Sequence, residues 1–195
     1  DQLGWEECSL IGHSMGAGVA TCVAGILSER VKRLILVEGL GPLSQPAEKV
    51  TELIRDSIQQ WNSLKTKKSP VYQNREEAVR ARHFAGKLKK SSVETLVARG
   101  LGENTDGLVW RSDPRLRIKS RLYLSEAQIL QMIQDITAHV LVIEAEDTDT
   151  RRWVDLLRSR LGYVKNLDHR ILPGGHHLHL DEPQSVASAI KDFLK

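Results

Sequence analysis

The residues best suited to chemistry form the stretch Gly12-His13-Ser14-Met15-Gly16, where the apolar run "CSLI" gives way to small residues. A serine hydroxyl can attack an electrophilic carbon when a neighbouring base takes its proton. Glycines on both sides indicate a tight turn between a strand and a helix, which leaves Ser14 Oγ free and brings the flanking residues so close to other backbone that a Cβ would clash. The N–H of Met15, at the start of that helix, would face a developing oxyanion. We therefore predict a nucleophile at Ser14 rather than a solvated serine in a glycine-rich turn.

Of the seven histidines, His176 in "LPGGHHLHLDEP" is the best candidate for the base. It comes just after the last predicted strand and before the last predicted helix. Where a nucleophilic serine stands on a turn of this kind, the catalytic histidine is the last of the catalytic residues along the chain. His13 is expected to pack beside Ser14. The run "HHLH" adds His177 and His179, but adjacent histidines point apart along a backbone and no Cys or Glu completes a ligand set. We therefore expect no metal at this run.

A carboxylate must hold the imidazole in one tautomer and stabilise its cation. Two places in the sequence could supply it. The first is Glu38, which ends the apolar run "RLILVE" and would be expensive to bury without a partner. The second is the loop after "HVLVIEA", with Glu146, Asp147 and Asp149. The residues alone leave both open, because Glu38 could instead cap the start of the following insert and the aspartates could form a solvated acidic turn.

Alternating strands and helices are needed to position these residues. Short runs rich in Leu, Ile and Val predict buried parallel strands at residues 8–12, 33–38, 139–145 and 169–174. Helical patterns follow at residues 15–28, 152–161 and 183–194. This alternation predicts an α/β fold with right-handed crossovers.

About half of the chain breaks the alternation. It shows apolar residues at helical spacing in the segments 46–64, 74–90, 91–99 and 125–136, and only residues 106–117 could be extended. An insert after one strand of such a sheet is expected to cover the carboxyl ends of the strands, where ligands bind. We therefore expect a core of residues 1–41 and 139–195 and a helical cap of residues 42–138.

Composition narrows the classes of function. The chain has 195 residues, of which 41% are hydrophobic and 27% charged, as in a globular domain. Its 28 basic and 25 acidic residues are too balanced to indicate a nucleic-acid partner, and no apolar run is long enough to span a membrane. Cys8 and Cys22 have neither metal-ligand nor disulfide-framework spacing. We expect reduced thiols in an intracellular, cytoplasmic protein, with a peroxisome or vesicle as alternatives.

Together the motifs resemble those of the α/β-hydrolase superfamily. The segments "LIGHSMGAGVA", "LILVEGLGP", "LVIEAED" and "LPGGHHLHLDEP" follow one another in the order in which that superfamily carries its corresponding motifs. The insert, with "SPVYQNREEAVRAR", "LVARG" and "GLVWRSDPRLR", is similar to the cap of the serine hydrolase-like (kraken-like) proteins of animals. The resemblance implies the C-terminal part of that fold, a mostly parallel sheet of about four strands with a helical cap insertion.

The same resemblance implies a function. It points to a serine hydrolase that cleaves carboxylic esters, thioesters or related acyl compounds, takes a small-molecule substrate and needs no cofactor. Ser14 would be the nucleophile, His176 the base and the Met15 N–H an oxyanion donor, with His13 beside them.

The sequence departs from the family pattern at the usual acid. That acid stands three residues after a glycine that follows the penultimate strand, and here Ala145 takes the place of the glycine and Thr148 that of the acid. Some members carry the acid after the preceding strand of the sheet, a position that Glu38 matches. The resemblance therefore ranks Glu38 before Asp147, with Asp149 third.

A second departure lies before the serine. Family members begin with about four more strands and a His-Gly loop, which supplies a second oxyanion N–H. If these 195 residues are the whole protein, "CSLIG" would be an exposed apolar edge that invites self-association, and the missing donor would lower the rate by about 10²–10³. The chain would then be a poorly stable, catalytically impaired fragment with a binding role or none. If the residues belong to a longer chain, the enzyme expectation holds, and C–C bond hydrolysis or a receptor role could use the same fold.

Overall fold

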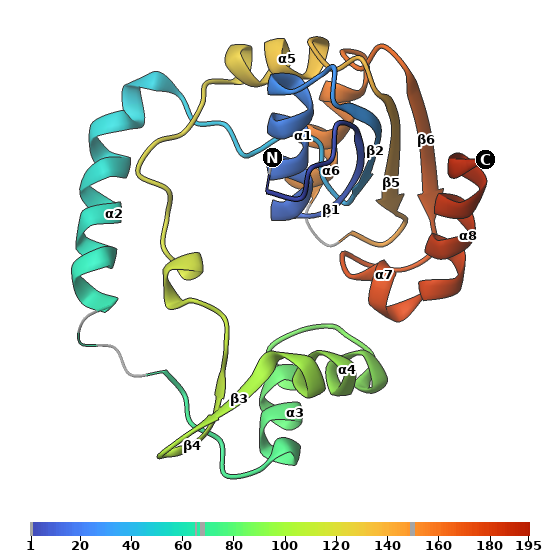
Figure 1. Cartoon of the computed structure of the whole chain (residues 1–195). Helices are drawn as coiled ribbons and strands as arrows, with labels where there is room; N and C mark the ends of the chain where they lie inside the picture. Colours follow the sequence, from blue (N-terminus) through green and yellow to red (C-terminus); the bar gives the residue numbers. More distant parts are fainter. Residues whose placement is uncertain (1, 65, 67–68, 149–150) are drawn as a thin grey trace. The chain divides into compact units, whose positions relative to one another are not determined.

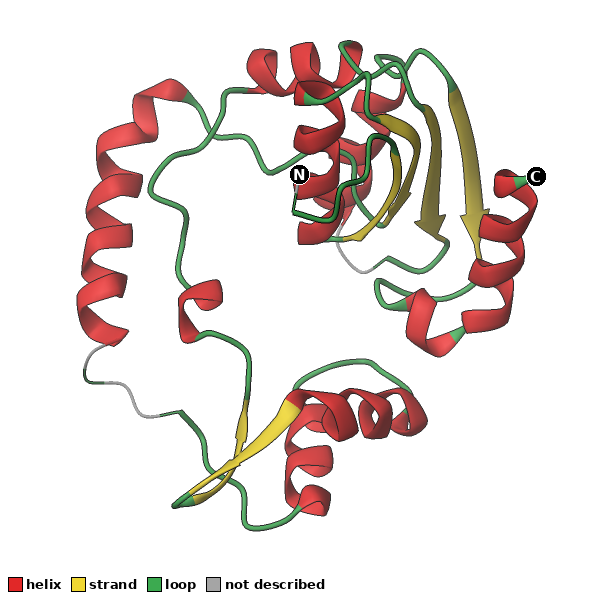
Figure 2. Cartoon of the chain, viewed as in Figure 1, coloured by secondary structure: helices red, strands yellow, loops and turns green. Residues whose placement is uncertain are grey.

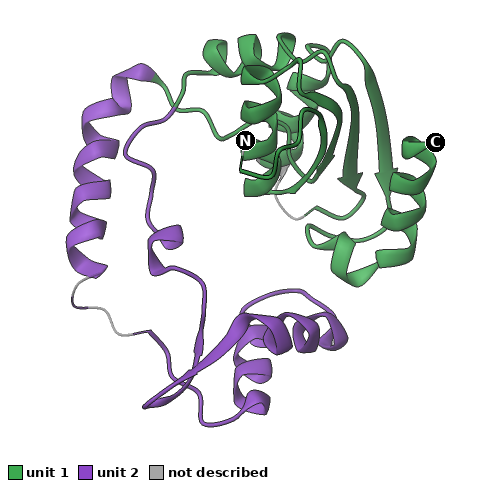
Figure 3. Cartoon of the chain, viewed as in Figure 1, with its two compact units in different colours: residues 1–46, 124–195 green, residues 47–123 purple. Residues whose placement is uncertain are grey.

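The computed structural model describes residues 2–64, 66, 69–148 and 151–195 (Figure 1). Within these residues the chain forms two compact units, unit 1 with residues 1–46 and 124–195 and unit 2 with residues 47–123 (Figure 3). Unit 1 is larger than the predicted core of residues 1–41 and 139–195. The reason is α5 (Glu126–Gln134), which packs Ile129 and Ile133 into the core beside α1 (Met15–Ile26).

Among the described residues, four parallel strands form the sheet of unit 1 in the order β1-β2-β5-β6 (Figure 2). They are β1 (Cys8–His13), β2 (Val31–Val37), β5 (His139–Ala145) and β6 (Leu167–Leu172). The predicted α/β fold with a mostly parallel sheet is confirmed. The fourth strand lies two residues earlier than predicted, because its pairing with β5 ends at Leu172 and a Pro-Gly-Gly sequence follows.

Side chains of the central strands alternate between two apolar layers. Leu34 and Leu36 of β2 belong to the layer that contains residues of α1, α5 and α6 (Arg151–Leu161). Ile35 and Val37 belong to the other layer, with residues of α7 (Leu178–Asp181) and α8 (Pro183–Leu194). Because β2 and β5 are covered on both faces, their sequences are nearly continuous runs of Leu, Ile and Val. The short helix α7 was not predicted.

Strand β1 is an outer strand of the sheet that the described residues form, and it exposes apolar side chains. Ile11 is 62% exposed, and Met15 and Val19 in the following helix are exposed as well. The apolar edge expected from "CSLIG" is therefore present in these residues. The self-association expected from it stays a prediction.

Unit 2 is mostly helical but also contains a hairpin. Its helices are α2 (Val50–Leu64), α3 (Arg75–Phe84) and α4 (Lys90–Gly100), with 3₁₀ turns at Ala47–Lys49 and Pro114–Arg117. The strands β3 (Leu101–Asn104) and β4 (Gly107–Trp110) pair antiparallel, and Gly107 provides the positive φ of 136° after their turn. None of the helices described in the structure is both long and apolar enough to cross a membrane.

A buried arginine ties the segment that follows β2 to α5. The side chain of Arg160, on α6, is 1% exposed. Its guanidinium donates to the carbonyl oxygens of Leu40 at 2.6 Å and Pro42 at 2.9 Å, and it forms a two-pronged ion pair with Glu126. The segment that leaves the end of β2 is therefore fixed from within unit 1.

Replacing Arg160 with Met should lower the free energy of unfolding by about 3 kcal/mol, because Glu126 and two backbone carbonyls lose their donor. Urea denaturation followed by circular dichroism measures this change. The matched control is Arg115→Met, whose ion-pair partner Asp113 lies at the surface and whose loss should change the midpoint little. Equal midpoints for the two variants would contradict the role assigned to Arg160.

Candidate active site

Ser14 lies on the turn between β1 and α1, in a strained backbone conformation with φ of 53°. Its N–H donates to the carbonyl oxygen of Val37 at 2.9 Å. Its own carbonyl accepts from the N–H groups of Ala17 and Gly18 in the first turn of α1. These bonds hold the serine at the carboxyl end of the sheet, between a strand and the N-terminus of a helix.

The two glycines that flank this serine are not equivalent. A Cβ on Gly12 would lie 2.4 Å from the backbone oxygen of Gly16, so only glycine fits there. A Cβ on Gly16 would meet nothing within 4 Å among the described residues. The expectation of a backbone clash is therefore confirmed for Gly12 and wrong for Gly16 within this part of the chain.

His176 reaches Ser14 from the loop between β6 and α7. Its Nε2 lies 2.9 Å from Ser14 Oγ, and its Nδ1 lies 3.0 Å from Glu38 Oε2. An ionised carboxylate only accepts hydrogen bonds, so Nδ1 carries the proton and Nε2 keeps the lone pair that accepts from the Ser14 hydroxyl. The ring is therefore held in the tautomer that a general base needs.

Glu38 follows β2 directly and has the same φ of 53° as Ser14. It is 1% exposed, and its carboxylate also accepts from the Ala145 N–H at 2.6 Å and the Thr148 hydroxyl at 2.6 Å. Burial alone would raise the pKa of Glu38, but the hydrogen bonds, led by that from His176, outweigh burial and hold the pKa below its usual value. The carboxylate is therefore ionised at neutral pH.

Among the described residues, the acid hydrogen-bonded to the imidazole of His176 is Glu38 and not Asp147. Asp147 is exposed, and its backbone N–H donates to the carbonyl oxygen of Gly174 at 3.0 Å. Asp149 lies outside the described residues. Of the two places that the sequence left open, the structure pairs the end of β2, Glu38, with His176.

Thr148 is a contributor to the site that sequence reasoning missed. It occupies the slot of the usual family acid, yet its hydroxyl donates to the carboxylate of Glu38. Ala145, in the place of the family's glycine, contributes its backbone N–H to the same carboxylate. The signal was present in the sequence, because a hydroxyl in that slot can hydrogen-bond an acid carried by the neighbouring strand.

Two further predicted residues flank the serine. Met15 is the first residue of α1, where backbone N–H groups have no partner within the helix. The Nε2–H of His13 donates to the carbonyl oxygen of His176 at 2.7 Å, so His13 anchors the loop that carries His176. Burial lowers the pKa of His13, which makes its ring neutral near pH 7.

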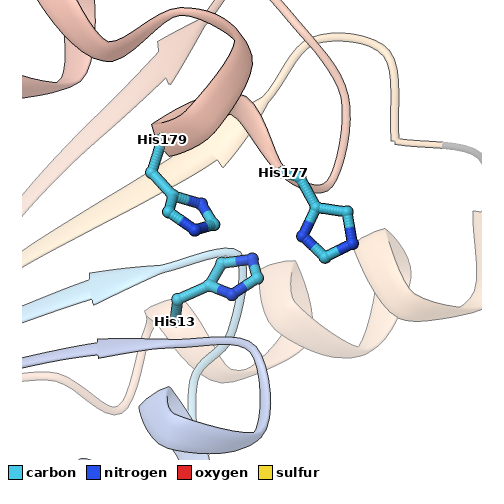
Figure 4. A group of neighbouring side chains, drawn as sticks. All are labelled: His13, His177 and His179. Atoms are coloured by element: carbon cyan, nitrogen blue, oxygen red, sulfur yellow. The ribbon is translucent and has the colours of Figure 1, made fainter. Parts of the chain in front are cut away.

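Two histidines that the sequence analysis set aside lie beside His13 (Figure 4). Ring nitrogens of His13, His177 and His179, one from each, all lie within 4.8 Å of one another. The histidines of "HHLH" were expected to point apart, but α7 begins directly after His177 and brings His179 back toward it. Nδ1 of His179 is buried without a hydrogen-bond partner among the described residues, and burial lowers the pKa of this ring to about 4.

Comparison with known families and proteins agrees with this geometry. The profile of the alpha/beta hydrolase family matches residues 3–189. A serine hydrolase-like protein of Dictyostelium discoideum is 28% identical over 208 residues, covering 100% of this chain and 57% of that protein. A serine hydrolase-like protein of Danio rerio is 29% identical over 216 residues, covering 100% of this chain and 63% of that protein. The chain therefore spans less than two thirds of the length of these relatives.

Solved structures show the same fold. A hypothetical protein from Pseudomonas aeruginosa superposes with a TM-score of 0.88 at 37% identity, covering 99% of this chain and 69% of that chain. A thioesterase domain from the curacin biosynthetic pathway superposes with a TM-score of 0.78 at 26% identity, covering 97% of this chain and 68% of that chain.

Replacing Gly12 with Ala should destabilise the protein by about 2–3 kcal/mol, because the new Cβ must displace the backbone of the first turn of α1. The control, Gly16→Ala, should be neutral or slightly stabilising, since it adds a methyl group in open space and favours the helix. Urea midpoints of the two variants measure the difference. A Gly16→Ala variant as unstable as Gly12→Ala would contradict the assignment of the close contact to Gly12.

Proposed function

Because this chain belongs to the alpha/beta hydrolase family, we propose that it is a serine hydrolase that cleaves carboxylic esters, thioesters or related acyl compounds. The observation that carries the proposal is the hydrogen-bonded chain from Ser14 Oγ through both ring nitrogens of His176 to Glu38. The relatives' names, serine hydrolase-like protein and thioesterase domain, support an acyl substrate.

The proposed reaction begins with attack of Ser14 Oγ on the acyl carbonyl carbon. The hydroxyl proton passes to Nε2 of His176, and the resulting imidazolium is stabilised by the ionised carboxylate of Glu38. Negative charge develops on the carbonyl oxygen, and the Met15 N–H at the N-terminus of α1 is the backbone donor proposed to face it.

Collapse of the tetrahedral intermediate completes the transfer. The bond to the leaving alcohol or thiol breaks, the leaving group takes the proton from His176, and the acyl group stays on Ser14 Oγ as an ester. A water molecule then attacks that ester while His176 takes its proton, and the acid product and the free serine are released. Both half-reactions require His176 to alternate between base and acid, which the fixed partner at Nδ1 permits.

We also propose that unit 2 is the cap that selects the substrate. The chain leaves unit 1 shortly after Glu38, at residue 46, and returns at residue 124, so unit 2 is inserted after the strand that carries the acid. Leu53, Val93 and Val97 of unit 2 are buried, and the unit is compact by itself. A separate packed unit can change its surface without disturbing the strands that position Ser14 and Glu38.

A fluorophosphonate probe should label the protein, and Ser14→Ala should abolish the labelling. The same variant should slow hydrolysis of p-nitrophenyl acetate by about 10³-fold or more, because no other group supplies the nucleophile. The control is Ser91→Ala, an exposed serine in α4, which should label as the parent does. Labelling and turnover by Ser14→Ala at the parent's level would overturn the role of Ser14. A folded parent that neither labels nor turns over the ester would overturn the proposed hydrolase function in favour of a binding role.

The choice of acid has its own test. Glu38→Gln should lower kcat by about 10³–10⁴-fold, because an amide neither fixes the productive tautomer nor stabilises the imidazolium. Asp147→Asn should leave kcat within about twofold, since this exposed side chain is not the partner of His176. Circular dichroism shows whether both variants remain folded. A large loss in Asp147→Asn, or no loss in either variant, would contradict the assignment of Glu38.

A further inference from the structure

Three histidines outside the Ser14, His176 and Glu38 group converge on one point. The feature consists of His13 at the end of β1, His177 before α7 and His179 within α7 (Figure 4). The register of β1 pairs His13 with Val37, and fully buried Leu178 anchors α7 in the apolar core between the other two histidines. Rigid elements therefore hold these rings near one another.

We infer that His13, His177 and His179 bind a divalent late transition ion, such as Zn²⁺, Ni²⁺ or Co²⁺. The donor set is imidazole nitrogen, which these borderline ions prefer and Mg²⁺ and Ca²⁺ do not. Three protein nitrogens leave a further coordination position for water, as in open three-histidine sites. The ligand nitrogens already lie within 4.8 Å of one another.

The unpartnered nitrogen of His179 is the second observation that points to a ligand. Buried polar atoms in proteins are almost always hydrogen-bonded, so a buried ring nitrogen without a partner needs an explanation. Nδ1 of His179 is such an atom among the described residues, and it belongs to one of the three converging rings. A bound ion would satisfy the lone pair of this nitrogen.

Binding requires a small closure of the rings. Two nitrogens at about 2.1 Å from a tetrahedral Zn²⁺ lie about 3.4 Å apart, so separations of up to 4.8 Å must shrink by rotation of side chains. If the ion binds Nδ1 of His13, the Nε2–H of that ring keeps its bond to the carbonyl oxygen of His176, and this bond orients His13 as a ligand. An ion at Nε2 would replace the proton of that bond and so act on the loop that carries the base.

The ion should inhibit the proposed hydrolysis, and this effect, unlike binding, rests on the proposed function. The ring of His176 is centred 4.9 Å from that of His13 and 5.1 Å from that of His177. An ion that draws His13 and His177 together also shifts the loop held by the bond from His13 to the carbonyl oxygen of His176. This shift disturbs the 2.9 Å approach of His176 Nε2 to Ser14 Oγ. We therefore expect the ion to lower the rate by about tenfold or more.

Isothermal titration of the chelator-treated protein with Zn²⁺ tests binding directly. One equivalent should bind, and Co²⁺ should give the visible absorption of a nitrogen-coordinated ion. His177→Gln and His179→Gln should each weaken Zn²⁺ binding by about tenfold or more, while His83→Gln, an exposed histidine on α3, should bind as the parent does. If His179→Gln does not fold, His177→Gln alone decides. No binding by the parent, or parent-like binding by the folded variants, would overturn the site.

The inhibitory effect is measured separately, by titrating Zn²⁺ into the p-nitrophenyl acetate assay. Each protein is compared with its own ion-free rate, and the expected result is inhibition of the parent that chelator reverses, with half-inhibition shifted about tenfold upward in His179→Gln. Bound Zn²⁺ without inhibition would overturn the effect on His176. Stoichiometric binding by a protein with no ion-free turnover would support the site and count against the proposed function, so the two failures are distinguishable.

Discussion

A carboxylate buried at the end of a central strand determines how the loops around it are arranged. Glu38 is 1% exposed, and a charge so placed is tolerated only where its oxygens are paired. The donors come from three places: the end of β5, the loop that follows β5, and the loop after β6. The indole N–H of Trp153 also donates to the carbonyl oxygen of Glu38 at 3.2 Å, which ties α6 to the same point. Segments more than a hundred residues apart in the sequence are therefore held at one edge of the sheet by one charge.

Parallel strand pairing is what brings Ser14 and Glu38 to the same level of the sheet. His13 pairs with Val37, and Val37 pairs with Ile143, so the first residues beyond β1 and β2 are neighbours. Ser14 and Glu38 each add one hydrogen bond to the pairing of the strands. The N–H of Ser14 donates to the carbonyl oxygen of Val37, and the N–H of Glu38 donates to that of Ile143. Each also has a φ of 53°, a conformation that costs about 1–3 kcal/mol and persists only where neighbouring structure enforces it. This conformation ends each extended strand and directs the side chains of Ser14 and Glu38 toward the imidazole of His176.

Local pattern was enough to predict Ser14, His176 and the four parallel strands, because a strand, a glycine turn and a helix are each encoded within a few residues. The carboxylate partner of His176 was left open among Glu38, Asp147 and Asp149, with Glu38 ranked first, since that choice depends on which loop reaches the imidazole in space. The predicted cap, residues 42–138, included α5, whereas the structure packs Ile129 of α5 into the core of unit 1. The apolar residues of a helix recur with the same period whether the helix packs on a cap or on the core, so the sequence pattern did not decide between them. The approach of His177 to His179 depends on the one-turn helix α7, which is too short to have a periodic signal.

His13 connects the two groups of side chains at this edge of unit 1. His176 is held by three hydrogen bonds: its Nδ1 pairs with Glu38, its Nε2 pairs with Ser14, and its main-chain carbonyl accepts from His13. Each of these partners lies on β1 or β2 or directly after one of them, so the orientation of the imidazole follows from the sheet of unit 1. The same His13 ring is centred 4.1 Å from that of His179, so one side chain contacts both the histidine cluster and the backbone of His176. Ser14, His176, Glu38 and the histidine cluster therefore all belong to unit 1, and none of them depends on a residue of unit 2 for these hydrogen bonds.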